Sequence, residues 1–138
     1  MSIQDNINAL STFVPETLGK FVADPNGFYR GHCVSLVKQW LKINKWPMLY
    51  GNAIKWQYRG DGKKYRYYKN TPSFVPNPGD MAIFDIGKYG HIGIVISATK
   101  KDMKVLNQNW PHGRLVDPVV ITTFDYLKPK CIGFLRKL

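Results

Sequence analysis

The residue best suited to chemistry is a cysteine at the start of a helical pattern. Cys33 opens a stretch in which apolar side chains recur at helical spacing, continuing through Leu36, Val37, Trp40 and Leu41. Backbone N–H groups and the helix dipole at such a start stabilise a thiolate, so the position suits a nucleophile. Because Cys33 also lies on the apolar stripe, a small buried thiol is the simpler interpretation of this residue taken alone.

A histidine and an asparagine on consecutive strand-like segments supply two further parts. His91 opens the apolar run 92–97, where backbone pairing would hold it within reach of a substrate, as a general base for a thiol requires. Asn107 ends the next run, and antiparallel pairing would bring its amide beside the imidazole and fix the ring. The alternatives are a surface loop histidine and an ordinary turn asparagine. Together with Cys33 they are the components of a Cys-His-Asn hydrolase.

The elements that must position these residues follow from the apolar periodicity. We expect helices at 3–22, interrupted at Pro15, and at 31–45, with a turn at 24–27 between them. The basic, aromatic-rich stretch 46–70 is expected to be an irregular connection. Short strands are expected at 81–84, 92–97, 103–107, 116–122 and 131–135. Helices followed by closely spaced strands favour an α+β class with an antiparallel sheet.

Length, charge and composition narrow the classes of function. The chain has 138 residues, the size of one domain, and a net charge of +11, which favours nucleic acid, acidic lipid or an acidic wall polymer as partner. No apolar run is long enough to span a membrane. Residues 1–10 lack a basic-then-apolar secretory leader, so we expect no signal peptide.

Two basic residues, Lys38 and Lys42, lie outside the apolar stripe of the helix at 31–45.

Five segments in order along the chain resemble the CHAP domain (cysteine, histidine-dependent amidohydrolase/peptidase), most closely that of phages infecting Gram-positive cocci. They are Gly-His-Cys-Val-Ser-Leu-Val at 31–37, Gly-Asn-Ala-Ile-Lys-Trp at 51–56, Pro-Asn-Pro-Gly-Asp at 76–80, Gly-His-Ile-Gly-Ile-Val at 90–95 and Asn-Gln-Asn-Trp at 107–110. The resemblance implies one papain-like domain over residues 1–138. It also implies a phage peptidoglycan hydrolase, an endolysin or a virion-associated lysin, that cleaves an amide bond in Gram-positive cell wall, as an amidase or an endopeptidase.

The same resemblance assigns roles to the site residues. Cys33 becomes the nucleophile and His91 the base. Asn107 stands where the family usually has a Glu that orients the histidine, and because a neutral amide stabilises imidazolium less, a weaker thiolate–imidazolium pair is expected. Asn109 matches the family's Asn, which would bind the reacting carbonyl or support the histidine.

Two neighbours of these residues are expected to bind substrate. His32 replaces the frequent Gln before the nucleophile, where it would donate to the oxyanion or compete as a base; a partly exposed residue at a helix start is the alternative. Trp110 completes the segment at 107–110. His112 is expected to be a loop histidine, and Cys131 a buried strand thiol that forms no disulfide with Cys33.

No cofactor is expected, and calcium is the metal that the resemblance raises. Some phage CHAP domains bind Ca²⁺ in a loop just before the nucleophile, through Asp side chains and backbone carbonyls. Asp24 matches, but Asn26 and Ser35 stand where carboxylates are usual, and Arg30 adds a cation that would pair with Asp24. Calcium affinity follows ligand charge, so we expect no tight site. The dispersed histidines and the lack of a zinc motif argue against zinc.

The partner and the setting follow from charge and resemblance together. We expect Gram-positive peptidoglycan as partner, with teichoic acid attracted to the Lys/Tyr-rich stretch 55–69; a plain solvated loop explains that stretch equally well, and nucleic acid less well. The protein would be made in the host cytoplasm without a signal peptide and act at the wall, released by a holin or delivered by a virion. The alternatives are a non-catalytic wall-binding module of the same fold and a basic nucleic-acid-binding protein.

Overall fold

The computed structural model describes residues 2–27, 32–111 and 117–138. Some residues named above lie outside the described ranges: Arg30, Gly31, His112 and the first residue of the strand expected at 116–122. In chain order the elements are α1 Ile3–Thr17, α2 Cys33–Ile43, η1 Ala53–Tyr58 (a 3-10 helix), β1 Tyr65–Lys69, β2 Met81–Phe84, β3 His91–Ala98, β4 Met103–Asn107, β5 Val120–Phe124 and β6 Cys131–Lys137. Helices come first and an antiparallel sheet follows, so the α+β class is confirmed.

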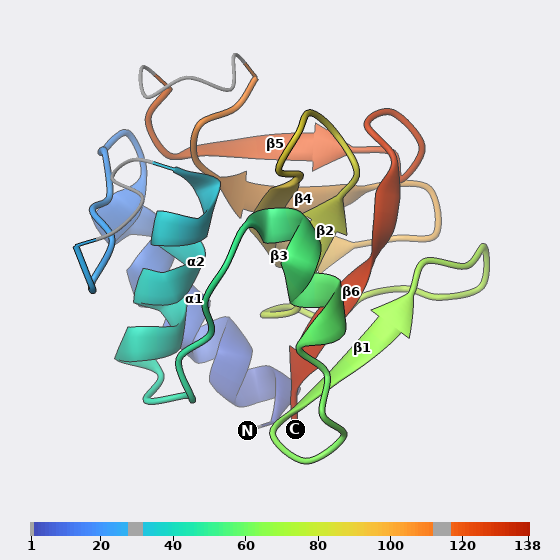
Figure 1. Cartoon of the computed structure of the whole chain (residues 1–138), viewed down its shortest axis with the longest axis horizontal. Helices are drawn as coiled ribbons and strands as arrows, with labels where there is room; N and C mark the ends of the chain where they lie inside the picture. The colour runs from blue at the N-terminus through green and yellow to red at the C-terminus, as the bar shows by residue number, and fades with distance from the viewer. Residues whose placement is uncertain (1, 28–31, 112–116) are drawn as a thin grey trace.

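The strands form one six-stranded sheet in which every pairing is antiparallel. The order is β1-β6-β2-β3-β4-β5. The chain runs through β2, β3 and β4 in turn, and the last strand, β6, returns to lie between β1 and β2 (Figure 1). β3 is therefore held on both sides, so His91, at its first residue, sits on a rigid element.

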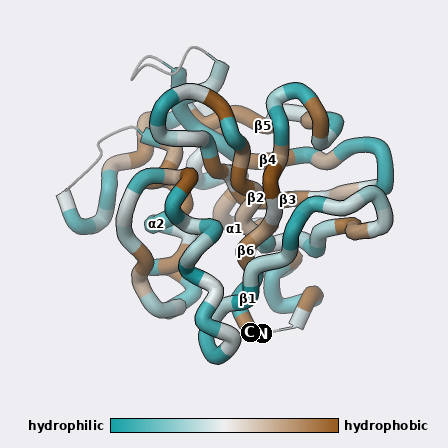
Figure 2. Tube along the Cα trace, turned by 45° about the vertical axis from the view of Figure 1, so that its right-hand side comes forward, coloured by the Kyte–Doolittle hydropathy of each residue, from teal (hydrophilic) through white to brown (hydrophobic). Residues whose placement is uncertain are grey.

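Both faces of the sheet are covered, because alternate residues of β2 belong to two different apolar clusters. Ile83 packs with α1 and α2 in the larger cluster, while Phe84 belongs to the second. Trp40 of α2 lies at the centre of the larger cluster, 5.3 Å from the ring of Phe13 in α1. Brown apolar segments meet at β2 and β3 in Figure 2, whereas many of the outer loops are teal. This packing fixes α2, and with it Cys33, against β3.

The first helix differs from the one expected at 3–22. It begins at a capping box on Ser2, runs through Pro15 without interruption and ends at Thr17. Pro15 lies in the last turn of the helix and is exposed. Because proline has no N–H, the carbonyl four residues earlier, on the exposed Ser11, has no helical donor. Gly19, in the left-handed region at φ 80°, turns the chain away.

Two further expectations were wrong. The stretch 46–70 contains η1 and the edge strand β1, which pairs on one side only and buries Tyr65. The strand expected at 116–122 forms instead at Val120–Phe124, because Pro118 has no N–H to donate to a ladder. Lys38, which falls outside the apolar stripe of α2, is nevertheless completely buried.

Candidate active site

The start of α2 and the start of β3 border one cleft of about 760 Å³. Residues 86–90 and the beginning of η1 complete its lining. Five of the six predicted site residues line it: His32, Cys33, His91, Asn109 and Trp110. The sixth, Asn107, is fully buried at the end of β4 and bonds to His91 from behind. The fold thus gathers into one place residues that lie up to 78 positions apart.

Cys33 is the first residue of α2 and is 8% exposed. Burial raises the pKa of its thiol to about 11, although hydrogen bonds from the backbone N–H groups of Ile92 and Val34 oppose that effect. The sulfur is therefore a neutral thiol at neutral pH. Cys33 and Cys131 are both free, and burial raises the pKa of Cys131 to about 12.

The hydrogen bond between His91 and Asn107 fixes the tautomer of the imidazole. Nε2 of His91 lies 2.7 Å from Oδ1 of Asn107. The amide cannot be turned round, because its Nδ2 donates to Oγ1 of Thr122 at 3.0 Å and to the carbonyl of Val120 at 3.2 Å. Oδ1 must then accept, so Nε2 carries the hydrogen. Nδ1 is left as the basic nitrogen.

The imidazole is also neutral, because its surroundings are apolar. His91 is 4% exposed, with the ring of Trp110 5.0 Å and that of Phe84 5.9 Å from its own, centroid to centroid. Burial lowers the pKa of His91 to about 4, although the bond to Asn107 opposes it. Thiol and imidazole are therefore both neutral at neutral pH.

Gly93, two residues after His91, lies where β3 and β4 approach each other closely. The register pairs Ile94 with Leu106, which places Gly93 opposite Asn107 and His91 diagonally across from it. A Cβ at Gly93 would lie 2.9 Å from the carbonyl oxygen of Leu106 and 3.0 Å from Cβ of Asn107. The glycine thus lets β3 and β4 lie close together beside Asn107. The sequence held this signal, a Gly within a strand.

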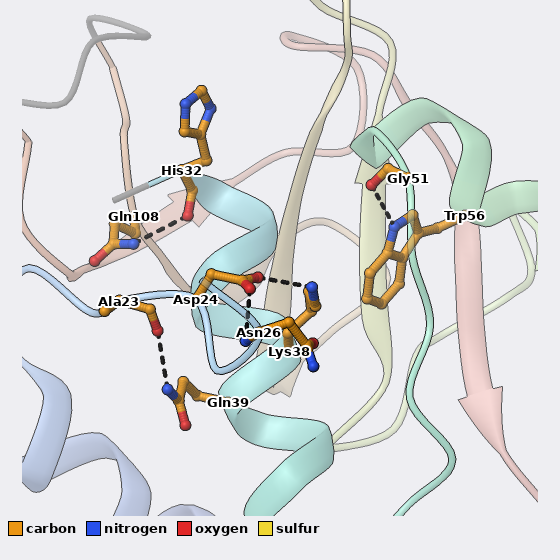
Figure 3. Close-up of polar contacts among 9 residues, drawn as sticks. All are labelled: Ala23, Asp24, Asn26, His32, Lys38, Gln39, Gly51, Trp56 and Gln108. Atoms are coloured by element: carbon orange, nitrogen blue, oxygen red, sulfur yellow. Dashed lines mark hydrogen bonds and ion pairs between the residues drawn. The ribbon is translucent and has the colours of Figure 1, made fainter. Parts of the chain in front are cut away.

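Gln108 belongs to the segment at 107–110, but sequence patterns assigned it no role. It is fully buried and bonds twice to the backbone of Val22, accepting from its N–H at 2.6 Å and donating to its carbonyl at 3.1 Å. The same Nε2 donates to the carbonyl of His32 at 3.0 Å (Figure 3). Gln108 therefore ties the end of β4 to the residue before the nucleophile. A glutamine after a strand carries no pattern of its own.

The remaining lining residues surround the thiol. His32 is the exposed N-cap of α2; its side chain makes no capping hydrogen bond. Asn109 adopts a left-handed backbone (φ 64°), and its buried Oδ1 has no hydrogen-bond partner among the described residues. Trp110 is half-buried beside the imidazole. Which of these side chains touch a substrate stays a prediction.

No metal cluster is found in the part of the chain that the structure describes: no three His, Cys, Asp or Glu side chains gather there. The carboxylate of Asp24 instead lies 2.8 Å from the ammonium of Lys38. The expected partner, Arg30, is outside the described residues. Among those residues, no helix is long and apolar enough to cross a membrane.

A helix-borne cysteine and a strand-borne histidine that share a cleft beside an antiparallel sheet form the arrangement of cysteine–histidine hydrolases. The model of the CHAP domain matches residues 23–109, a segment that contains Cys33, His91, Asn107 and Asn109. The chain belongs to the CHAP domain family.

Similar sequences come from staphylococcal phages. The chain is 35% identical over 94 residues to the endolysin LysK of Staphylococcus phage K, covering 63% of this chain and 19% of LysK. It is 30% identical over 118 residues to the endolysin PlyTW of Staphylococcus phage Twort, covering 75% of this chain and 24% of PlyTW. The match therefore spans about a fifth to a quarter of the length of these relatives.

Solved structures share the fold. The wild-type endolysin LysIME-EF1 superposes with a TM-score of 0.78 at 23% identity, covering 99% of this chain and 64% of that one. Ly7917 gives a TM-score of 0.66 at 12% identity, with 99% of this chain and 62% of that one covered. At these identities the likeness extends to the fold alone, and it agrees with the family assignment.

Proposed function

We propose that this CHAP domain is a peptidoglycan hydrolase of a phage lytic system, an endolysin or a virion-associated lysin, that cleaves an amide bond in Gram-positive cell wall. One observation carries the proposal. Cys33 and His91 line the same cleft, and Asn107 holds the imidazole with Nδ1 available as a base. The family and its endolysin relatives support the substrate class.

The chemistry begins from a neutral pair. As the sulfur of Cys33 attacks the amide carbon, its proton passes to Nδ1 of His91, so no free thiolate is required. The C=O π pair moves onto the oxygen, which the backbone N–H of Cys33 would stabilise. When the intermediate collapses, the C–N bond breaks and the leaving nitrogen takes the proton from His91. Water, deprotonated by the same imidazole, then cleaves the thioester and regenerates the thiol.

Asn107 acts through His91, and three cleft residues act on the substrate. Asn107 keeps the ring oriented throughout, because its own amide is fixed by Val120 and Thr122. Asn109, His32 and Trp110 are proposed to contact the substrate around the reacting carbonyl. The mechanism uses no cofactor.

The setting is part of the same proposal. A net charge of +11 would attract the domain to a wall rich in teichoic acid. Synthesis in the host cytoplasm, followed by release through a holin-type pore or delivery by a virion, would bring it to that wall.

The test is digestion of purified staphylococcal and streptococcal peptidoglycan, with products identified by mass spectrometry. Wild type should release fragments whose new termini identify the bond, either the muramoyl–alanine amide or a peptide bond. Cys33→Ala should release none, whereas the matched variant Cys131→Ala, which removes the other buried thiol, should still cleave. Equal release by wild type and Cys33→Ala would exclude a thiol mechanism.

A non-catalytic wall-binding module is the second candidate, and the neutral resting state of Cys33 and His91 is the observation in its favour. Such a module would sediment with peptidoglycan equally well as wild type and as Cys33→Ala, without releasing fragments from either wall.

A further inference from the structure

Outside the cleft, a lysine ammonium is completely buried against the loop that precedes the nucleophile. Nζ of Lys38, on α2, lies 2.8 Å from Oδ1 of Asp24, and both side chains are 0% exposed. The ring of Tyr50 lies 4.9 Å from the same ammonium. Figure 3 shows the lysine reaching from the helix to the carboxylate, whose other oxygen accepts the backbone N–H of Asn26 at 2.7 Å. This ion pair connects the loop to the helix that begins at Cys33.

Neighbouring residues of the loop are anchored in the same way. The carbonyl of Ala23 accepts from Nε2 of Gln39 at 2.9 Å, again from α2 (Figure 3). The backbone of Val22 is held by Gln108 from the end of β4. Three consecutive residues, 22–24, are therefore fixed by three long side chains. This described part of the loop is held by groups that belong to the chain itself.

Calcium, which some family members bind in this loop, does not fit here. Ca²⁺ takes six to eight oxygen ligands and gains its affinity from several carboxylates. Asp24 supplies one, whereas Asn26 and Ser35 are neutral, and Oγ of Ser35 is buried without a hydrogen-bond partner among the described residues. An ammonium already sits at hydrogen-bond distance from that single carboxylate. A divalent ion placed there would meet a like charge, and of Asp24, Asn26 and Ser35 only the first would offer it a carboxylate.

We infer that the ammonium of Lys38 serves residues 22–26 as a built-in cation, so that this part of the loop keeps its conformation without calcium. Lys38 is a positioning residue: it acts on Cys33 through the loop and α2 and touches no substrate. Removing one partner of a buried ion pair takes a close counter-charge away from the other, which is more damaging than removing both. The stability of the domain should therefore depend on the ion pair between Lys38 and Asp24 and not on a bound metal.

Thermal unfolding followed by circular dichroism tests this inference without any need for wall cleavage, so it can fail independently of the proposed function. The Tm of wild type should be the same in EDTA and in millimolar CaCl₂. Lys38→Met should lower the Tm by roughly 10 °C. Lys42→Met, an exposed lysine one turn further along α2, is the matched control and should leave it unchanged. Asp24→Asn combined with Lys38→Met should recover much of the loss.

A gain of calcium dependence is the sharper test. The triple variant Lys38→Met/Asn26→Asp/Ser35→Asp replaces the ammonium with carboxylates around Asp24. Its Tm should rise by several degrees with CaCl₂, and Tb³⁺ bound there should show emission sensitised by Tyr50, whereas wild type should show neither effect. If the triple variant does not fold, the wild-type and Lys38→Met measurements decide. Stabilisation of wild type by calcium, or a Lys38→Met Tm equal to that of wild type, would overturn the inference.

Discussion

The buried imidazole of His91 should make the stability of this domain sensitive to acid. His91 titrates near 6.5 in an unfolded chain, but burial lowers its pKa to about 4 in the fold. Between these values the unfolded state binds a proton that the folded state does not. The contribution of His91 is therefore fully present above pH 6.5 and is lost as the pH falls toward 4. Below pH 4 both states are protonated, and no further loss arises from this residue.

The size of the effect follows from the pKa shift. One pKa unit corresponds to about 1.4 kcal/mol, so a shift from 6.5 to about 4 is worth about 3 kcal/mol over the whole interval. Between pH 7.5 and pH 4.5 the expected loss is roughly 2–3 kcal/mol. Since domains of this size unfold with only about 5–15 kcal/mol, the effect is large enough to measure.

The assay compares urea unfolding of wild type and His91→Gln at pH 7.5 and pH 4.5. Glutamine cannot titrate, so its cost should be smaller at pH 4.5 by the 2–3 kcal/mol that wild type has lost there. Val95→Ala, a buried substitution on the same strand, should cost the same at both pH values because it removes no titrating group. An equal cost of His91→Gln at the two pH values would refute the claim that the folded imidazole is neutral.

Four further outcomes follow from the site. Alkylation of Cys33 by iodoacetamide should accelerate about tenfold per pH unit from pH 7 to 10, since its pKa is about 11; an early plateau, with Cys33→Ala as background, would contradict this. Asn107→Ala should slow peptidoglycan clearing roughly 100-fold with little change in wall binding, measured by turbidity and sedimentation. Gln108→Ala should lower the free energy of unfolding in urea by about 2–3 kcal/mol, because it removes the hydrogen bonds to the backbone of Val22 and His32. A change near zero would show that Gln108 does not hold these two segments together. Gly93→Ala should cost about 1–3 kcal/mol and break the His91–Asn107 bond, seen as a shifted imidazole ¹⁵N resonance.

Local patterns predicted the elements that carry the site. The apolar runs at 81–84 and 103–107 form strands with those bounds, and the apolar stripe of α2 begins at Cys33 as expected. These elements follow from periodicity because each buries its apolar side chains against a neighbouring layer. The antiparallel pairing of β3 with β4, which brings Asn107 to His91, followed from the short connection between the two strands.

Non-local contacts explain what the sequence could not predict. The edge strand β1 gains its order from β6, which is distant in the chain, and its mixture of tyrosines and basic residues resembles a loop until the partner is known. Lys38 is buried because the loop holding Asp24 folds over a side of α2 that periodicity assigns to solvent. Pro15 is tolerated because it falls in the last turn of α1. For β1 and Lys38 the deciding neighbour lies outside the window that a local pattern covers, whereas Pro15 depends only on where α1 ends.

The cleft and the loop before it have one feature in common: both lack negative charges that are usual in the family. At Asn107, Asn26 and Ser35 the chain has neutral residues where the family usually has acids. In the mechanism and the ion pair proposed above, hydrogen-bond geometry therefore takes the place of these negative charges. The fixed amide of Asn107 selects the tautomer of His91, which leaves Nδ1 as the nitrogen that would take the proton in the proposed mechanism. The carboxylate of Asp24 is paired with the buried ammonium of Lys38. Restoring an acid at position 107 alone should then disturb the site, because its second oxygen would face the carbonyl of Val120, where the amide now donates.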